Sequence, residues 1–290
     1  MNLAIDHVLG RLDQPLRLVD VARVAMLSPF HFHRVFQALA GETLADFVKR
    51  ARLDRALFMM SHARKGRSSS LTRIALACGF SSSSDFSRSF KQRFGVAPSA
   101  FDLTAWRDAH RAELESTMPR ESHLKRLPAA KNPDGFKVKI RELPARTVAY
   151  IRVSDPYKPN AVFDAAQRLL AWAEQRSLAD GQWLGYQWEN PELVPLEQCR
   201  YHAAVVVDRP FSARGEIGRF SFPPMTVAQV EVRGGIDLEL RALYWLFGTW
   251  LPRSGYVPDD HPCFEAWIGR PFAHGVERFE LHAQLPVRRM

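Results

Sequence analysis

The sequence predicts two domains of different fold class. The first is an all-α N-terminal domain, in which two helix-turn-helix units are joined by a connecting helix. The second is an α+β C-terminal domain with a duplicated β-α-β-β order. A short phrase recurs at constant spacing early in the chain, and the apolar periodicity changes from helical to alternating after Gly135. We therefore expect domains at 1–110 and 135–290, separated by a charged, proline-containing linker at 111–134.

The repeated phrase carries its aromatic residues and its glycine at matching positions. With a constant offset of 54 residues, Phe32, Phe36, Gly41 and Phe47 correspond to Phe86, Phe90, Gly95 and Phe101. Residues four apart lie on one stripe of a helix, so each pair of phenylalanines is expected in a core. Each glycine stands where a helix should end.

The start of each repeated helix has its own capping signal. Ser28 precedes Pro29, which suits the first helical position, and Ser82 with Asp85 has the spacing of a capping box. The outward stripes are polar or cationic and contain no acid, as a helix in a DNA major groove requires. These candidate DNA-binding residues are Pro29, Phe30, His33, Arg34 and Gln37 in the first copy, and Ser83, Ser84, Ser87, Arg88 and Lys91 in the second.

Periodicity predicts the remaining elements. In the first domain, helices are expected at 3–12, 16–25, 44–60 (the connector) and 99–110, with a basic, serine-rich break at 63–70. In the second, strands are expected at 137–141, 147–153, 183–188, 202–207, 227–232, 264–268 and 279–287, with helices at 162–176 and 238–251.

Positive charge is concentrated in the half that holds the repeat. Residues 1–110 contain 16 Lys/Arg against 9 Asp/Glu, whereas residues 135–290 contain 19 against 18. This imbalance favours a polyanionic partner for the first domain. Ordinary solubilising charge is the alternative.

Several classes of protein are not indicated. Three cysteines without a CxxC motif argue against a disulfide framework or a zinc finger, and His31 and His33 do not face each other on a helix, so no metal site is predicted. The sequence has no signal peptide pattern and no apolar stretch that could cross a bilayer, which predicts a cytoplasmic protein with no membrane partner. It also lacks the common catalytic and nucleotide-binding motifs, so we expect neither an enzyme nor a cofactor.

Residues 16–103 resemble the DNA-binding domain of AraC/XylS-type transcription regulators. Two segments carry the resemblance, Leu18–Phe36 and Ile74–Phe101, and the second matches the family signature nearly position by position. The resemblance implies that both recognition helices enter major-groove segments of one DNA site, about 34 Å apart. The family's contact positions correspond to most of the outward residues given above. Phe30 departs from the longer polar residue or tryptophan usual in the family, and a phenylalanine there suits contact with a thymine methyl group.

Residues 136–290 resemble the GyrI-like effector domain. The cues are the doubled β-α-β-β order and two segments, 184–191 and 262–267. The resemblance implies that Glu265 is an anionic contact for a cationic or amphiphilic effector, although Trp267 stands where the family usually has tyrosine. Large rings around a carboxylate suit an organic cation. The candidate effector-binding residues are Glu265, Trp172, Tyr186, Trp188, Phe264 and Trp267.

The favoured hypothesis is a sequence-specific DNA-binding transcription regulator that senses a small cationic or amphiphilic molecule, with RNA polymerase as a further partner. One alternative is a protein that sequesters a small molecule or toxin while its basic domain tethers it to DNA. The other is a GyrI-like hydrolase, which rests on analogy alone.

Overall fold

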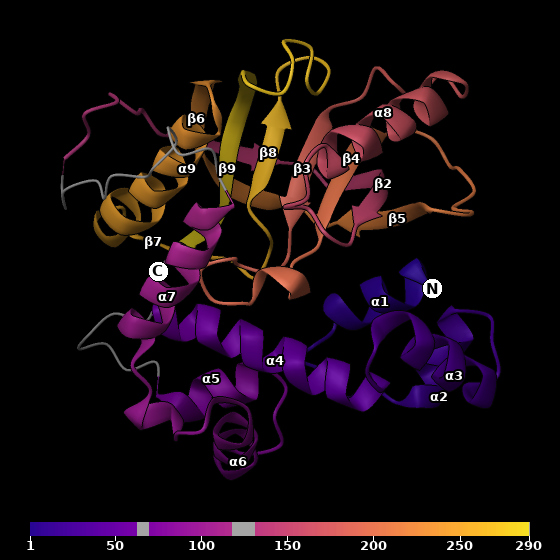
Figure 1. Cartoon of the computed structure of the whole chain (residues 1–290), viewed down its shortest axis with the longest axis vertical. Helices are drawn as coiled ribbons and strands as arrows, with labels where there is room; N and C mark the ends of the chain where they lie inside the picture. Colours follow the sequence, from indigo (N-terminus) through magenta and orange to yellow (C-terminus); the bar gives the residue numbers. More distant parts are fainter. Residues whose placement is uncertain (63–69, 118–130, 290) are drawn as a thin grey trace. The chain divides into compact units, whose positions relative to one another are not determined.

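The computed structural model describes residues 1–62, 70–117 and 131–289, which form two compact units, Met1–Asp108 and Ala109–Met290 (Figure 1). Most of the expected serine-rich break at 63–70 and of the expected linker at 111–134 therefore lies outside the described residues. None of the described helices is long and apolar enough to cross a bilayer.

The N-terminal unit is helical, as the sequence predicts. Its helices are α1 (Asn2–Leu9), α2 (Leu18–Val24), α3 (Pro29–Ala40), α4 (Leu44–Ser61), α5 (Leu71–Ala77), α6 (Ser83–Phe94) and the start of α7 (Leu103–Ser116). The helix pairs α2–α3 and α5–α6 are the two helix-turn-helix units, and α4 connects them. The last helix continues six residues beyond the predicted end at 110, so part of the expected linker is helical.

The predicted caps form at both recognition helices. The Ser28 hydroxyl oxygen accepts a hydrogen bond from the His31 amide at 3.3 Å, and that of Ser82 accepts one from the Asp85 amide at 3.1 Å. The Asp85 carboxylate accepts a hydrogen bond from the Ser81 hydroxyl at 2.9 Å, so the second half of the capping box reaches one residue further back than predicted. Gly41 and Gly95 end these helices in the left-handed conformation, with φ of 75° and 79°.

Each copy of the repeat builds its own aromatic core. Phe32, Phe36, Phe86 and Phe90 are all at most 1% exposed. In the first copy the ring of Phe36 lies 5.5 Å from that of Phe47, with the planes nearly perpendicular. The phenylalanine spacing therefore predicted the buried face of both helices correctly.

Ion pairs fix the connecting helix to both copies. Arg50 of α4 donates a hydrogen bond of 2.6 Å to the carboxylate of Glu42, which follows the first recognition helix. Arg93, near the end of the second recognition helix, donates to Asp54 on α4 at 2.9 Å. The Asp54 side chain is only 10% exposed, so this contact is well shielded from solvent.

The C-terminal unit contains one antiparallel sheet of nine strands with order β1-β6-β9-β8-β3-β4-β2-β5, and β7 pairs with β9. The strands are β1 (Lys139–Leu143), β2 (Arg146–Val153), β3 (Trp183–Gln187), β4 (Tyr201–Val207), β5 (Ile217–Phe222), β6 (Met225–Gly234), β7 (Tyr256–Pro258), β8 (Phe264–Trp267) and β9 (Phe279–Arg289). The sequence did not predict β5 or β7. The order β2-α8-β3-β4 is repeated as β6-α9-β8-β9, which confirms the duplicated β-α-β-β unit.

Two helices cover the same face of this sheet, which we call the helix face (Figure 1). They are α8 (Ala161–Glu174) and α9 (Ile236–Trp245). The main core lies beneath them and includes Ala149, Leu169 and Val205. The opposite face carries a second cluster, centred on the rings of Tyr150, Tyr186, Phe222 and Phe264.

The helix predicted at 238–251 has a composite form. After Trp245 its backbone widens into a π-helical turn (Leu246–Trp250) and then tightens into a 3₁₀ turn (Leu251–Arg253). Single π turns are rare and are often found at functional sites.

Candidate DNA-binding surface and effector site

The outward face of α3 carries the residues predicted for DNA contact. Pro29, Phe30, Arg34 and Gln37 are exposed and His33 is half-buried. Phe30 is 73% exposed although it is strongly apolar. The guanidinium of Arg34 lies 5.8 Å from the centre of this ring, so the two side chains form one composite surface.

The outward face of α6 is smaller and more polar. Ser84, Arg88 and Lys91 are exposed, while Ser83 and Ser87 are half-buried. Short hydroxyl side chains reach less far into a groove than arginine does, which favours contacts to phosphate.

Arg34 and Arg88 have no acidic partner among the described residues, unlike Arg50 and Arg93, which pair with carboxylates beside α4. The nearest acid in sequence to Arg88 is Asp85, whose carboxylate accepts a hydrogen bond from Ser81. The structure thus separates arginines that stabilise the fold from arginines whose charge is available to a ligand.

The six predicted effector residues do not lie together, because the sheet divides them. Successive side chains of a strand point to opposite faces. Glu265 and Trp267 of β8 point to the helix face, and Trp172 of α8 packs onto that face beside Phe211. The other three residues, Tyr186, Trp188 and Phe264, belong to the cluster on the opposite face.

Glu265 lies where the two halves of the duplicated sheet pair. On the neighbouring strand β3, Gly185 is the pairing partner of Glu265. A side chain at Gly185 would overlap both the Glu265 carboxylate and the Tyr201 hydroxyl. The Tyr201 hydroxyl donates a short hydrogen bond of 2.5 Å to Glu265 Oε2. Burial raises the pKa of Glu265 to about 7, against the opposing effect of this hydrogen bond.

A second carboxyl group shares this environment. Glu239 of α9 is 3% exposed, and its side chain has no hydrogen bond or ion pair within the described part of the chain. Burial, and then the charge of Glu265, raise the pKa of Glu239 well above its usual range. With no basic residue of the described ranges to neutralise them, these two carboxyl groups hold their protons more strongly than free carboxyl groups do.

The opposite face already contains a cation of the protein itself. The Arg146 guanidinium lies 4.3 Å from the centre of the Phe264 ring and 5.7 Å from that of Phe222. Burial lowers the pKa of Arg146 to about 10. Since Arg146 occupies the face of Phe264, a ligand cation would have to displace it there.

Sequence reasoning missed Tyr201 and Glu239, although one signal for Glu239 was available. Glu239 and Ala242 lie on the buried side of α9, and Leu246 directly after the helix continues their spacing, so a carboxyl group stands within an apolar stripe. No comparable signal identifies Tyr201, because its contact with Glu265 joins strands 64 residues apart in the sequence.

Two protein families match the chain. The GyrI-like small molecule binding domain matches residues 136–288, and a helix-turn-helix domain matches residues 21–103. A DNA gyrase inhibitor from Edwardsiella piscicida is 32% identical over 162 residues, covering 53% of this chain and 99% of that protein. The probable transcriptional regulator LumQ from Photobacterium leiognathi is 30% identical over 103 residues, which is 36% of this chain and 40% of LumQ.

Among solved structures, a transcriptional regulator from Chromobacterium violaceum with an AraC-type DNA-binding domain is also similar. It is 28% identical, with a TM-score of 0.31, and the alignment covers 33% of this chain and 83% of that one.

Proposed function

Because this chain belongs to the GyrI-like small-molecule-binding family and carries an AraC-type helix-turn-helix domain, we propose how this transcription regulator reads DNA and what it senses. Helices α3 and α6 enter adjacent major-groove segments of one DNA site. A small organic cation binds at Glu265 and changes the action of the regulator at its promoter, where RNA polymerase is the expected partner.

The two recognition helices have different roles in this proposal. Phe30 and Arg34 of α3 offer an apolar ring and a bidentate donor, the groups that read a thymine methyl and a guanine edge. The serines and Arg88 of α6 are better suited to phosphate oxygens, which fix the position of the protein on the duplex. Sequence preference should therefore come mainly from α3.

DNA binding is tested on fragments selected from genomic DNA by the full-length protein. We expect Arg34→Ala to weaken binding by about 1–3 kcal/mol and to relax base preference at one position. Arg88→Ala should weaken binding to all DNA sequences by the same factor. It should also reduce the slope of log K against log salt concentration by roughly one. Arg219→Ala removes an exposed arginine from β5 and is the matched control. Wild-type affinity in both recognition-helix variants would rule out this assignment.

The observation that carries the effector proposal is the uncompensated acid pair. Among the described residues, neither Glu265 nor Glu239 has a basic partner, and a buried carboxylate without a counter-ion is costly. A ligand cation would supply the missing charge, and Trp267, 5% exposed beside Glu265 on β8, offers an aromatic surface. This combination favours a delocalised organic cation over a metal ion, which prefers several oxygen ligands.

The effector proposal is tested with tetraphenylphosphonium as the cation and triphenylphosphine oxide as a neutral analogue. Isothermal titration of the full-length protein should detect the cation and not the analogue. Glu265→Gln and Glu239→Gln should each weaken binding by tenfold or more, whereas Glu277→Gln, at an exposed position of the same unit, should not. Equal binding of the cation and the analogue would contradict the proposed charge recognition.

Transcription in vitro from a selected fragment then separates regulation from simple sequestration. A regulator gives a change in transcript level that follows occupancy of the Glu265 site and is lost in Glu265→Gln. Saturation of the site without any change in transcription would favour the alternative in which the DNA-binding unit only tethers a small-molecule binder.

A further inference from the structure

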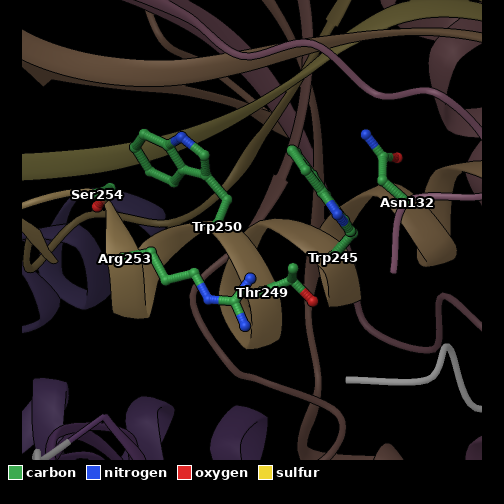
Figure 2. Close-up of a pocket in the computed structure, with 6 residues that line it drawn as sticks. All are labelled: Asn132, Trp245, Thr249, Trp250, Arg253 and Ser254. Carbon is green, nitrogen blue, oxygen red and sulfur yellow. The ribbon is translucent and has the colours of Figure 1, made fainter. Parts of the chain in front are cut away.

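Charged side chains are arranged differently in two places outside the proposed contact sites. In the C-terminal unit, a pocket of about 240 Å³ lies along the end of α9 (Figure 2). Its lining consists of Asn132, Trp245, Thr249, Trp250, Arg253 and Ser254. One of these residues is charged and none is acidic, so the pocket indicates no particular partner. In the N-terminal unit, by contrast, four charged side chains contact one another in series.

This series, which we call the charge chain, runs from the end of the first recognition helix to the end of the second. The Arg50 guanidinium donates to the Glu42 carboxylate through Nε at 2.9 Å and Nη2 at 2.6 Å. Its Nη1 lies 3.5 Å from Oδ2 of Asp54, one turn further along α4. The other carboxylate oxygen of Asp54 accepts a hydrogen bond from Arg93 of α6 at 2.9 Å. Asp54 therefore joins an arginine tied to the first copy to an arginine of the second.

The charge chain is shielded from solvent. None of its four side chains is more than 24% exposed. Burial raises the pKa of Asp54, against the opposing charges of Arg93 and Arg50, and burial lowers the pKa of Arg93. Replacing both partners of a shielded ion pair by apolar residues of similar volume is often neutral for stability, whereas the hydrogen bonds of the pair have strict geometry. The charge chain is therefore better suited to fixing the positions of helices than to stabilising the fold.

The internal repeat does not reproduce the charge chain. At the offset of 54 residues, the counterpart of Glu42 is Val96 and the counterpart of Arg93 is Leu39. Both counterparts are exposed apolar residues. The phenylalanines of the two cores, in contrast, occur in both copies. The charge chain thus does not belong to the core that each helix-turn-helix unit needs, and it is built once, between the copies.

A second contact holds the copies together on nearly the opposite side of α4. Arg52 donates hydrogen bonds of 2.8 Å to the carbonyl oxygens of Leu12 and Gln14, and its guanidinium lies against the turn at Gly79. Residues two apart on a helix point about 200° apart around its axis. The connecting helix is therefore held on two sides, and loss of the charge chain would leave the second copy attached on one side.

We propose that the charge chain sets the spacing between the two DNA segments that the protein binds at once. This proposal rests on the proposed entry of α3 and α6 into adjacent major-groove segments. One extra base pair between these segments moves the second segment by about 3.4 Å and turns it by roughly 35° around the DNA axis. Rigidly joined recognition helices cannot follow this change, whereas loosened ones follow it in part.

DNA fragments of altered spacing test the proposal. A fragment selected from genomic DNA by the full-length protein is compared with versions that have one base pair inserted or removed between the two segments, which footprinting locates. The wild type should bind the altered versions at least about tenfold more weakly, because one recognition helix loses its contacts. In Asp54→Leu/Arg93→Met, which replaces the shielded pair by apolar side chains, this spacing penalty should be about threefold or less.

An exposed ion pair of the same composition provides the matched control. Asp20 and Arg23 pair at 3.2 Å within α2, and both side chains are more than half exposed. Asp20→Leu/Arg23→Met should therefore keep the wild-type spacing penalty, whatever its overall affinity. Glu42→Gln weakens the other end of the charge chain and should lower the penalty, which keeps the test decisive if the buried double variant folds poorly.

Distances between two spin labels measure the same rigidity without DNA. Ala38→Cys and Gln92→Cys place the labels at exposed, equivalent positions of α3 and α6, with the half-buried Cys263 replaced in Cys263→Ser. The distance distribution should be broader when Asp54→Leu/Arg93→Met is added. Equal spacing penalties in the wild type and this double variant, or an unchanged distance distribution, would overturn the proposal. Absence of sequence-selective DNA binding would instead refute the proposed function and leave the label measurement standing.

Discussion

Replacing Gly79 by alanine should destabilise the N-terminal unit much more than replacing Gly41. Gly79 lies in the turn between α5 and α6, with φ of 84°, and a Cβ atom there would overlap the carbonyl oxygen of Leu12. It would also come within 2.9 Å of the Arg52 guanidinium. Arg52 is itself fixed by hydrogen bonds of 2.8 Å to the carbonyl oxygens of Leu12 and Gln14. The turn of the second copy is thus packed against the segment that follows α1.

Gly41 is the matched control because it has nearly the same conformation and open space. Its φ is 75°, and nothing lies within 4 Å of the position that a Cβ atom would take. Gly41→Ala should therefore cost only the left-handed backbone, about 1–2 kcal/mol. Gly79→Ala carries this cost too, and the displaced backbone adds about 1–3 kcal/mol of overpacking. Weakening of the Arg52 hydrogen bonds would increase the difference further.

Urea unfolding followed by the helical circular dichroism signal measures both losses, and gel shift measures DNA affinity at a temperature where both variants are folded. Gly41→Ala should bind DNA like the wild type, whereas the shifted turn in Gly79→Ala should weaken binding because α6 moves with it. Equal free energies of unfolding for the two variants would refute the proposed close contact with Leu12.

Three further perturbations test other parts of the structure. Met26→Gly should raise the free energy of unfolding of the N-terminal unit, measured by urea unfolding, by about 1 kcal/mol. Met26 has φ of 55° and is 86% exposed, so glycine relieves backbone strain and loses little burial. A destabilised variant would indicate that Met26 packs in a way its exposure does not suggest. Asp54→Ala should cost about 3 kcal/mol, since it removes the shielded carboxylate that accepts a hydrogen bond from Arg93. A loss below about 1 kcal/mol would mean that the pair behaves like an exposed one. The folded C-terminal unit binds more protons than the unfolded chain between about pH 4.5 and pH 7, because the pKa of Glu265 is raised to about 7, so its stability should fall as pH rises through that window. In thermal melts, the melting temperature of Glu265→Gln should fall less steeply with rising pH than that of the wild type. Identical pH profiles of the two proteins would exclude this carboxyl group as a source of the pH dependence.

The helical unit was largely predictable because its determinants are local. The spacing of Phe32 and Phe36, the cap at Ser28 and the stop at Gly41 all act within one helix, and the second copy repeats them. The exposed stripe then follows as the side opposite the phenylalanines. What the sequence did not reveal is the contact between Gly79 and Leu12, because it joins segments that are adjacent only in the folded unit.

The sheet was predicted less completely, for two physical reasons. The strand β7 has three residues and β5 contains Gly218 and two polar residues, so neither gives a strong alternating pattern. The predicted effector site groups residues by their chemistry, whereas side-chain alternation separates them: Phe264 and Glu265 are neighbours on one strand and must face opposite ways. The pairing of Phe264 with Arg146, across 118 residues of sequence, could not have been read from either segment alone.

Both units are built by duplication, and in each the candidate function depends on what the two copies do not share. In the N-terminal unit the cores are equivalent, while the outward residues differ: Phe30 stands where the second copy has Ser84. An internal repeat with two different surfaces can bind an asymmetric DNA site in one orientation, which a symmetric pair could not specify.

In the C-terminal unit the asymmetry lies at the seam between β3 and β8. The first half contributes Gly185, which leaves space, and Tyr201, which donates to the carboxylate; the second half contributes Glu265 and Glu239. Neither half contains the acid pair together with its hydrogen-bond donor. A cation bound there would contact both halves at once, so any change in how they pair would alter its affinity, and by linkage the cation would favour one pairing over another.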